Sequence, residues 1–79
     1  MATKAFILIE TAVGKTQDVT GELQGISAVK TADTMTGPYD IIAVVRAPNL
    51  NAVGDLVTVQ IHSISGIVRT TTCLSISSS

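Results

Sequence analysis

The sequence predicts an α+β fold in the order strand, helix, strand, strand, helix, strand, on the strength of three observations. Two five-residue runs, AFILI at residues 5–9 and IIAVV at residues 41–45, are apolar at every position, as expected of strands buried on both faces. Apolar residues at helical spacing follow each run. Strand-like segments of mixed polarity, typical of sheet edges, complete the pattern. This is the order of the ferredoxin-like fold, a four-stranded antiparallel sheet with two helices on one face.

The first half of the chain supplies one helix and one edge strand. The segment VGKTQD contains a Gly, a Thr and an early Asp, which suit a helix start, and Val19, Leu23 and Ile26 follow at helical spacing. We expect this helix to end near Gly25. Gly21 inside it costs about 1 kcal/mol relative to Ala, so the helix depends on packing. Residues 28–35, AVKTADTM, have the composition of an edge strand.

The second half repeats the pattern after the turn TGPY, in which Pro38 suits the second position. Pro48 ends the second apolar strand, and Asn49 is expected to cap the second helix. The apolar residues near one face of that helix are Leu50, Val53, Val57 and Ile64, flanked by Leu56 and Ile61. SISG, with Gly66, closes it. Residues 67–76 form an edge-like last strand, with Val68, Thr70, Thr72 and Leu74 on one face and Ile67, Arg69, Thr71 and Cys73 on the other. We expect Ser77, Ser78 and Ser79 to be frayed.

Length and composition favour an oligomer. A chain of 79 residues makes a single domain, 1–79, that buries only roughly two-thirds of its unfolded surface. With a single Cys and a single His, the chain cannot stabilise its fold with an internal disulfide or a structural metal site. The central strands are apolar on both faces, whereas the helices cover only one. A second copy is the simplest cover for the open face, which predicts a sheet-to-sheet dimer.

The charges and the hydropathy pattern exclude several partners. Five scattered cations and a net charge of −1 provide no basic stripe for phosphates, so direct nucleic-acid binding is not expected. No apolar run approaches the roughly 20 residues that span a bilayer, and the sequence predicts a soluble, cytoplasmic protein without a membrane partner. No acid–base pair or metal cluster is visible. We therefore expect no enzyme activity, no cofactor and no metal.

Two motifs carry a family resemblance over nearly the whole chain. Gly37-x-Tyr39-Asp40 precedes an apolar strand, and Gly66-Ile67-Val68-Arg69-Thr70-x-Thr72 enters the last strand. With these motifs the sequence resembles the C-terminal effector-binding domain of the Lrp/AsnC transcription regulators, in a stand-alone form without the helix-turn-helix domain. The resemblance implies a sheet-to-sheet dimer, octamer-like rings of dimers, and a small effector, commonly an amino acid, bound where dimers meet. We further expect such a module to act by co-assembling with full-length Lrp/AsnC regulators.

The resemblance makes five residues the candidate ligand contacts: Gly37, Tyr39, Asp40, Thr70 and Thr72. Asp40 could accept hydrogen bonds from a ligand ammonium group, and loop amides near Gly37 could receive its carboxylate. The alternative is that Asp40 bonds turn amides and Tyr39 packs at a subunit contact. For Thr70 and Thr72 the alternative is that Thr is simply a good strand residue. We interpret His62 and Cys73 as structural residues.

Three rival functions share this strand order. A small dimeric enzyme of the cofactor-free monooxygenase type would need more His, Asn, Trp or Tyr than the chain contains, although fold alone does not decide function. An RNA-binding sheet needs aromatic residues on its central strands, and Phe6 is alone there. The third rival is an amino-acid-sensing domain of the ACT type, but the Gly-x-Tyr-Asp turn favours the Lrp/AsnC effector-binding domain instead. The sequence thus favours a sensing and oligomerisation module.

Overall fold

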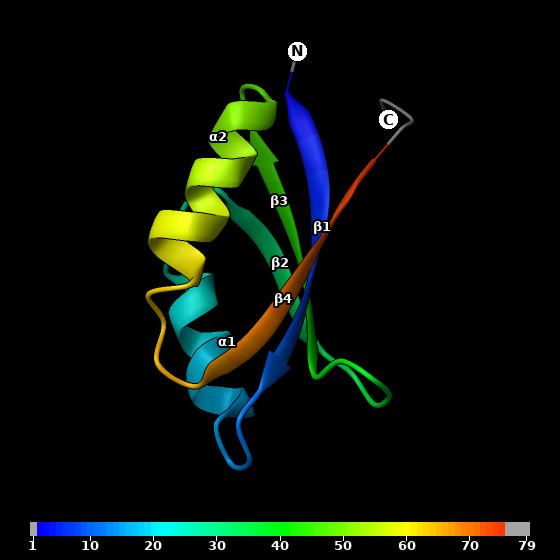
Figure 1. Ribbon diagram of the computed structural model, residues 1–79, viewed down its shortest axis with the longest axis vertical. Coiled ribbons are helices and arrows are strands. Elements are labelled where there is room, and N and C mark those ends of the chain that lie inside the picture. The colour runs from blue at the N-terminus through cyan, green and yellow to red at the C-terminus, as the bar shows by residue number, and fades with distance from the viewer. Residues whose placement is uncertain (1, 76–79) are drawn as a thin grey trace.

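The structure is a computed structural model that describes residues 2–75, and it confirms the predicted order of elements (Figure 1). The strands are β1 (Thr3–Thr11), β2 (Val29–Thr34), β3 (Ile41–Ala47) and β4 (Ile67–Leu74). The helices are α1 (Thr16–Gln24) and α2 (Leu50–Asp55), the second of which continues into a π-helix, η1 (Leu56–Ile61). The strands form one antiparallel sheet in the order β2-β3-β1-β4. The two apolar runs therefore lie in the central strands, as predicted.

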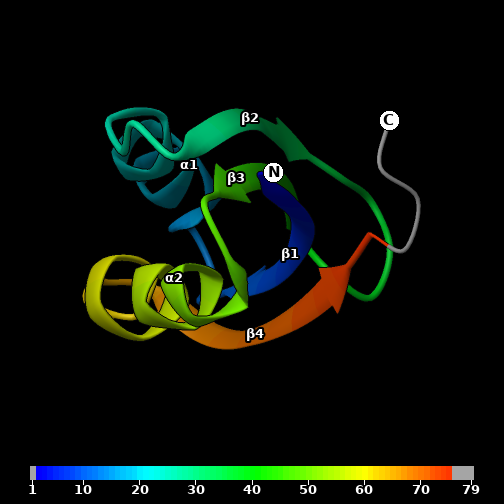
Figure 2. The same cartoon turned by 90° about the horizontal axis from the view of Figure 1, so that it is seen from above.

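The core lies between the sheet and the helices, which both cover the same face (Figure 2). Alternate residues of the two central strands are fully buried there: Ala5, Ile7, Ile9, Ile41, Ala43 and Val45. Val19 and Leu23 of α1, Val53 of α2 and Ile61 of η1 pack against them. Each buried aliphatic side chain of this size contributes about 1.5 to 3 kcal/mol. The helices are short, so this packing stabilises them more than their propensity does.

The other face of the sheet is not covered by any element of the chain among residues 2–75, and we call it the open face. Phe6 and Leu8 of β1 point to it, and they lie beside Val44 and Ile42 of β3. These four side chains are half-buried. The prediction that the central strands are apolar on both faces is therefore confirmed.

The second helix differs from the prediction in its geometry. Asn49 caps it as expected, because its Oδ1 accepts a hydrogen bond from the backbone N–H of Ala52 at 2.9 Å. From Leu56 the turns widen, and the N–H of His62 donates to the carbonyl of Val57 at 2.9 Å, a π-helical bond. The wider turn brings Leu56 and Ile61, which are five residues apart, to the same buried side. Ile64, expected on the helix, lies in the turn after it.

The predicted boundaries differ by a few residues elsewhere. β1 and β3 extend beyond the apolar runs, to Thr11 and Ala47 respectively, and α1 ends just before Gly25 as predicted. Ile76 and the three terminal serines, Ser77, Ser78 and Ser79, lie outside the described residues. None of the helices within residues 2–75 has the length and apolarity needed to cross a bilayer.

Candidate functional site

The connection between β2 and β3, residues 35–40, projects beyond the sheet on the side away from the helices (Figure 1). Gly37 lies in this connection with a φ of 135°, a backbone conformation that residues with a Cβ rarely adopt. Apart from atoms of Gly37 itself and of its two chain neighbours, no atom comes within 4 Å of the position that a Cβ would occupy. The loop is therefore exposed, and its backbone can be approached closely by a ligand or a neighbouring molecule.

Asp40 anchors this loop to the end of β1. Its Oδ2 accepts a hydrogen bond from the backbone N–H of Thr11 at 2.8 Å. Its own N–H donates to the carbonyl of Ile9 at 2.9 Å, and its carbonyl accepts from Met35 at 2.7 Å. The β1–β4 register shifts between Glu10 and Thr11, so the carboxylate satisfies a backbone donor beside that irregularity. Thus Asp40 does bond a backbone amide, the alternative that the sequence left open, while a carboxylate retains further acceptor positions.

Tyr39 lies across the open face. Its hydroxyl is 3.2 Å from the Oγ1 of Thr71 on β4, and β1 lies between β3 and β4. The ring must therefore cross β1 to reach that threonine. Thr71 pairs with Leu8, which points to the open face, so the contact is made on that face. The half-buried Tyr39 is consequently placed at the edge of the apolar surface formed by the central strands.

The two predicted threonines point to the opposite face of the sheet. The Oγ1 of Thr70 is 2.9 Å from the Nε2 of His62, which follows η1. Thr70 and Ile41 flank Ile9 on either side and are two strand spacings, or about 10 Å, apart. Thr70 and Asp40, which precedes Ile41, therefore lie at the same end of the sheet. Thr72 lies further along β4. The structure therefore groups Gly37, Tyr39 and Asp40 but separates Thr72 from them.

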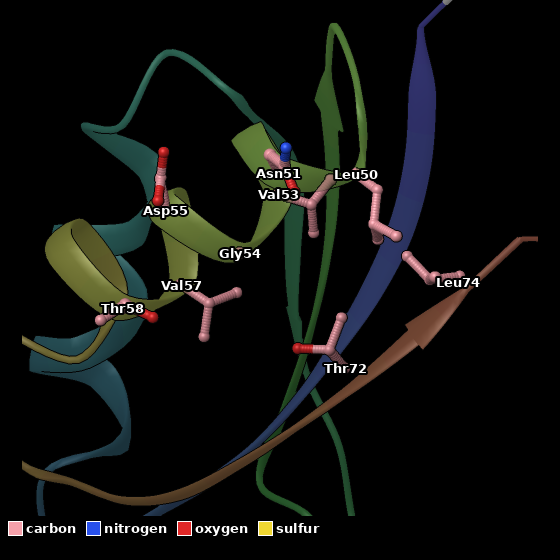
Figure 3. Close-up of a pocket in the computed structure, with 9 residues that line it drawn as sticks. All are labelled: Leu50, Asn51, Val53, Gly54, Asp55, Val57, Thr58, Thr72 and Leu74. Atoms are coloured by element: carbon pink, nitrogen blue, oxygen red, sulfur yellow. The ribbon is translucent and has the colours of Figure 1, made fainter.

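Thr72 instead lines an open groove of about 890 Å³ between α2, the start of η1 and β4 (Figure 3). The groove is lined by Leu50, Asn51, Val53, Gly54, Asp55, Val57, Thr58, Thr72 and Leu74. Leu50 and Leu74 point toward one another at one end, and Val57 and Thr72 face one another further along. Its walls suit a partly aliphatic small molecule. Asp55 is the one charged residue in its lining.

Sequence reasoning missed the residues that hold the predicted ones in place. Thr11 donates to Asp40, Thr71 contacts Tyr39, and His62 contacts Thr70. Strand alternation could have placed Thr71 on the open face, but no sequence signal pairs Thr11 with a residue so distant in the chain. Within residues 2–75, no cluster of three His, Cys, Asp or Glu side chains could hold a metal ion.

Comparison with known families and structures defines the class of protein. Residues 4–79 match the family model described as the Lrp/AsnC ligand binding domain. The chain therefore belongs to this family, as the two motifs predicted. The family consists of regulatory ligand-binding domains, which points to a sensing module rather than an enzyme. A search of the curated proteins found no match.

Solved structures agree with the family assignment. The crystal structure of FFRP-DM1 has a TM-score of 0.89 and 34% identity, with 94% of this chain and 99% of that chain covered. TTHA0845 from Thermus thermophilus has a TM-score of 0.91 and 31% identity, covering 98% of this chain and 96% of that one. The complex of the transcriptional regulator NMB0573 from Neisseria meningitidis with L-Met has a TM-score of 0.86. At 16% identity, over 95% of this chain and 50% of that one, it is similar in fold.

Proposed function

We propose that this chain senses a free amino acid and oligomerises, and that it modulates full-length Lrp/AsnC regulators by assembling with them. The observation that carries the proposal is the match of residues 4–79 to the Lrp/AsnC ligand binding domain. The amino-acid class is supported by the L-Met complex of a protein with the same fold. The chain pairs with a second copy through its open face, where apolar residues of β1 and β3 lie side by side.

The effector binds at the loop of residues 35–40, where dimers meet. The exposed backbone around Gly37 receives the ligand carboxylate, because amides without a neighbouring side chain can be approached closely. Asp40 holds the ammonium group with the acceptor positions that Thr11 does not use. A ligand held between two dimers stabilises the assembly that buries it, which links sensing to oligomerisation.

The substitution Asp40→Asn tests this assignment better than Asp40→Ala. The Asn carbonyl oxygen can still accept the hydrogen bond from Thr11, so the loop remains anchored, but the negative charge is lost. Common amino acids are first screened for thermal stabilisation of the wild type, and the best is titrated calorimetrically into both proteins. We expect a loss of about tenfold to a hundredfold in affinity, the value of a charge-assisted hydrogen bond.

Two further variants make the result specific. Asp18→Asn removes the same charge from the exposed surface of α1 and should leave the affinity unchanged. Thr72→Val keeps the shape of its side chain but removes the hydroxyl from the groove between α2 and β4. If Thr72→Val abolishes binding while Asp40→Asn binds like the wild type, the effector lies in the groove and the loop assignment is wrong. If no amino acid stabilises the wild type, the proposed ligand class is wrong.

A further inference from the structure

The sheet end where β1 begins and β3 finishes carries two cations side by side (Figure 1). The register of these strands pairs Lys4 directly with Arg46. Both residues alternate with the buried positions Ala5, Val45 and Ala47, so both point to the open face. Directly opposed residues of neighbouring strands have Cβ atoms about 5 Å apart. The two positive charges therefore belong to one small patch of the surface.

Lys30 adds a third cation next to this pair. It lies at a register shift in the pairing of β2 with β3. Its Nζ donates a hydrogen bond to the carbonyl oxygen of Ser27 at 3.3 Å. The carbonyl oxygen of the next residue, Ala28, accepts a hydrogen bond from the backbone N–H of Arg46 at 3.0 Å. The ammonium group of Lys30 therefore lies near the same end of β3, and we call Lys4, Lys30 and Arg46 the basic cluster.

The basic cluster has no compensating carboxylate within residues 2–75. No ion pair in this part of the chain involves Lys4 or Arg46, and the Nζ of Lys4 instead lies 5.3 Å from the centre of the Phe6 ring. The cluster contains three of the five cations of a chain whose net charge is −1. The acidic residues lie on the helices or towards the opposite end of the strands: Glu10, Asp18, Glu22, Asp33, Asp40 and Asp55. Positive charge is thus concentrated at one end of the sheet.

This arrangement is unfavourable for the empty protein. Like charges directly opposite one another destabilise a pair of strands, and nothing in the core requires a cation at either position. Arg46 is exposed and Lys4 is half-buried. A bound anion reverses the balance, because the guanidinium fork can pair with two oxygen atoms of one phosphate group while the ammonium group adds a point charge. The pattern is therefore better explained by an anion site than by a structural role.

We propose that the basic cluster binds a small anion with two linked phosphate groups, either inorganic pyrophosphate or the diphosphate of a nucleotide. Lys4 and Arg46 hold one phosphate group, and Lys30 receives the second. A single phosphate group would leave the third cation unpaired, so two linked groups match the cluster better. All three cations come from one chain, and the loop of residues 35–40 lies at the opposite end of β3. The anion site is therefore independent of the proposed effector site and of the pairing of copies.

The direct test is a titration of ¹⁵N-labelled protein with sodium pyrophosphate, followed by NMR. It is carried out at low ionic strength, because salt screens interactions between exposed charges. We expect the shifts of the backbone amide signals to concentrate at residues 3–6, 28–31 and 45–47. Shifts that gather instead around Lys15, at the start of α1, would overturn the proposal.

Charge-removing variants assign the binding to the cluster. Lys4→Gln and Arg46→Gln should each raise the Kd of pyrophosphate about tenfold, which is the effect of losing one charge-assisted hydrogen bond. Lys30→Gln should raise it by a smaller factor. Lys15→Gln removes an exposed cation away from the cluster and is the matched control, so it should leave the Kd unchanged. Equal effects of Lys15→Gln and Arg46→Gln would mean that only net charge matters, and the proposed site would be wrong.

Stability provides a second measurement that a purely structural role would not reproduce. Without the anion, Arg46→Gln should be at least as stable as the wild type, because the repulsion from Lys4 is removed. With saturating pyrophosphate, the urea midpoint of the wild type should rise, and that of Arg46→Gln should change little. If Arg46→Gln is destabilised without the anion and stabilised by it as much as the wild type, Arg46 is structural and the proposal is overturned.

Two further ligands identify the chemistry that is recognised. Succinate carries two carboxylates and no phosphate, and binding as tight as that of pyrophosphate would reject phosphate recognition. ADP that binds more tightly than pyrophosphate identifies a nucleotide as the ligand, whereas weaker binding of ADP identifies the inorganic anion. No response of the wild type to any of these ligands would overturn the proposal. If Arg46→Gln then weakened self-association, the cluster would serve the contact between copies instead.

Discussion

At the scale of single residues, Gly66 lies where the turn before β4 packs tightly against the start of helix α1. Its φ is 103°, and a Cβ there would lie 3.0 Å from the Cβ of Lys15 and 3.1 Å from the Cγ2 of Val19. Its carbonyl also accepts a hydrogen bond from Ala12 at 2.8 Å, so the backbone is held in this position. Both the conformation and the lack of space require glycine.

We therefore expect Gly66→Ala to lower the free energy of unfolding by about 2 kcal/mol, since a positive φ alone costs an L residue roughly 1 to 2 kcal/mol. Urea denaturation at one fixed protein concentration measures the change, because association would otherwise alter the apparent stability. An unchanged midpoint would mean that the turn before β4 relaxes away from α1. Gly37→Ala separates the cost of a positive φ from the cost of a steric contact, because Gly37 also has a positive φ but has open space around it.

Asp40 shows how far the candidate site could be predicted from the sequence. Its position between a turn and an apolar strand was enough to single it out, and the structure places it with Gly37 and Tyr39 at one sheet end. Its partner Thr11 lies 29 residues away in the chain, and no local pattern identifies it. The sequence therefore singled out residues that lie together in this connection, but it did not predict the contacts that they make.

At the scale of elements, α1 is a short helix with weak local support. It has nine residues, and no side chain caps its N-terminus at Lys15. Only Val19 and Leu23 of the helix are buried, while Gly21 is exposed with no atom within 4 Å of a Cβ position. Its packing against the sheet, rather than its own sequence, holds it in place.

Gly21→Ala should consequently stabilise the protein by about 0.5 to 1 kcal/mol. Alanine has a higher helix propensity and restricts the unfolded chain, and here it meets no neighbour. A rise in the urea midpoint with an unchanged slope measures this effect. The two substitutions are therefore expected to change the free energy of unfolding in opposite directions, since Gly21→Ala raises it and Gly66→Ala lowers it. A Gly21→Ala variant less stable than the wild type would contradict the placement of this residue on an open helix surface.

The second helix shows what element-level sequence reasoning could not find. The cap at Asn49 was predicted from residue type and position, because a side-chain acceptor beside a helix start acts locally. The π-helical turns of η1 were not predicted. They bury Leu56 and Ile61 together against the sheet, and the spacing that achieves this depends on the shape of the core rather than on the segment itself.

At the scale of the whole molecule, the proposed pairing through the uncovered apolar surface of the central strands predicts that stability depends on association. We expect the midpoint of thermal unfolding to rise with protein concentration, as it does when dimerisation and folding are linked. Leu8→Lys should abolish this dependence, because it places a cation in the middle of the paired faces. Calorimetry of the wild type and of Leu8→Lys over a wide range of protein concentrations measures how the midpoint of each protein depends on concentration. Val59→Lys, at a residue that is 66% exposed, is the matched control.

A midpoint that is independent of concentration in the wild type would contradict the predicted pairing. It would mean that the half-buried residues of the open face, Phe6, Leu8, Ile42 and Val44, are sufficiently covered by one another. If Val59→Lys also abolished the concentration dependence of the midpoint, the copies would associate through the helix side of the molecule instead.

The sequence by itself determined the order of elements and the place of each strand in the sheet. AFILI and IIAVV are apolar at every position, and only a central strand in this fold has two faces to bury. The tertiary structure decided the registers between strands, the π-helical turns and the contacts of Asp40 and Tyr39. β1 and β3 are not joined by a hairpin, so no turn sets their register. Lys4 and Arg46 become neighbours because the packed core aligns the two strands, and that alignment is a property of the assembled fold.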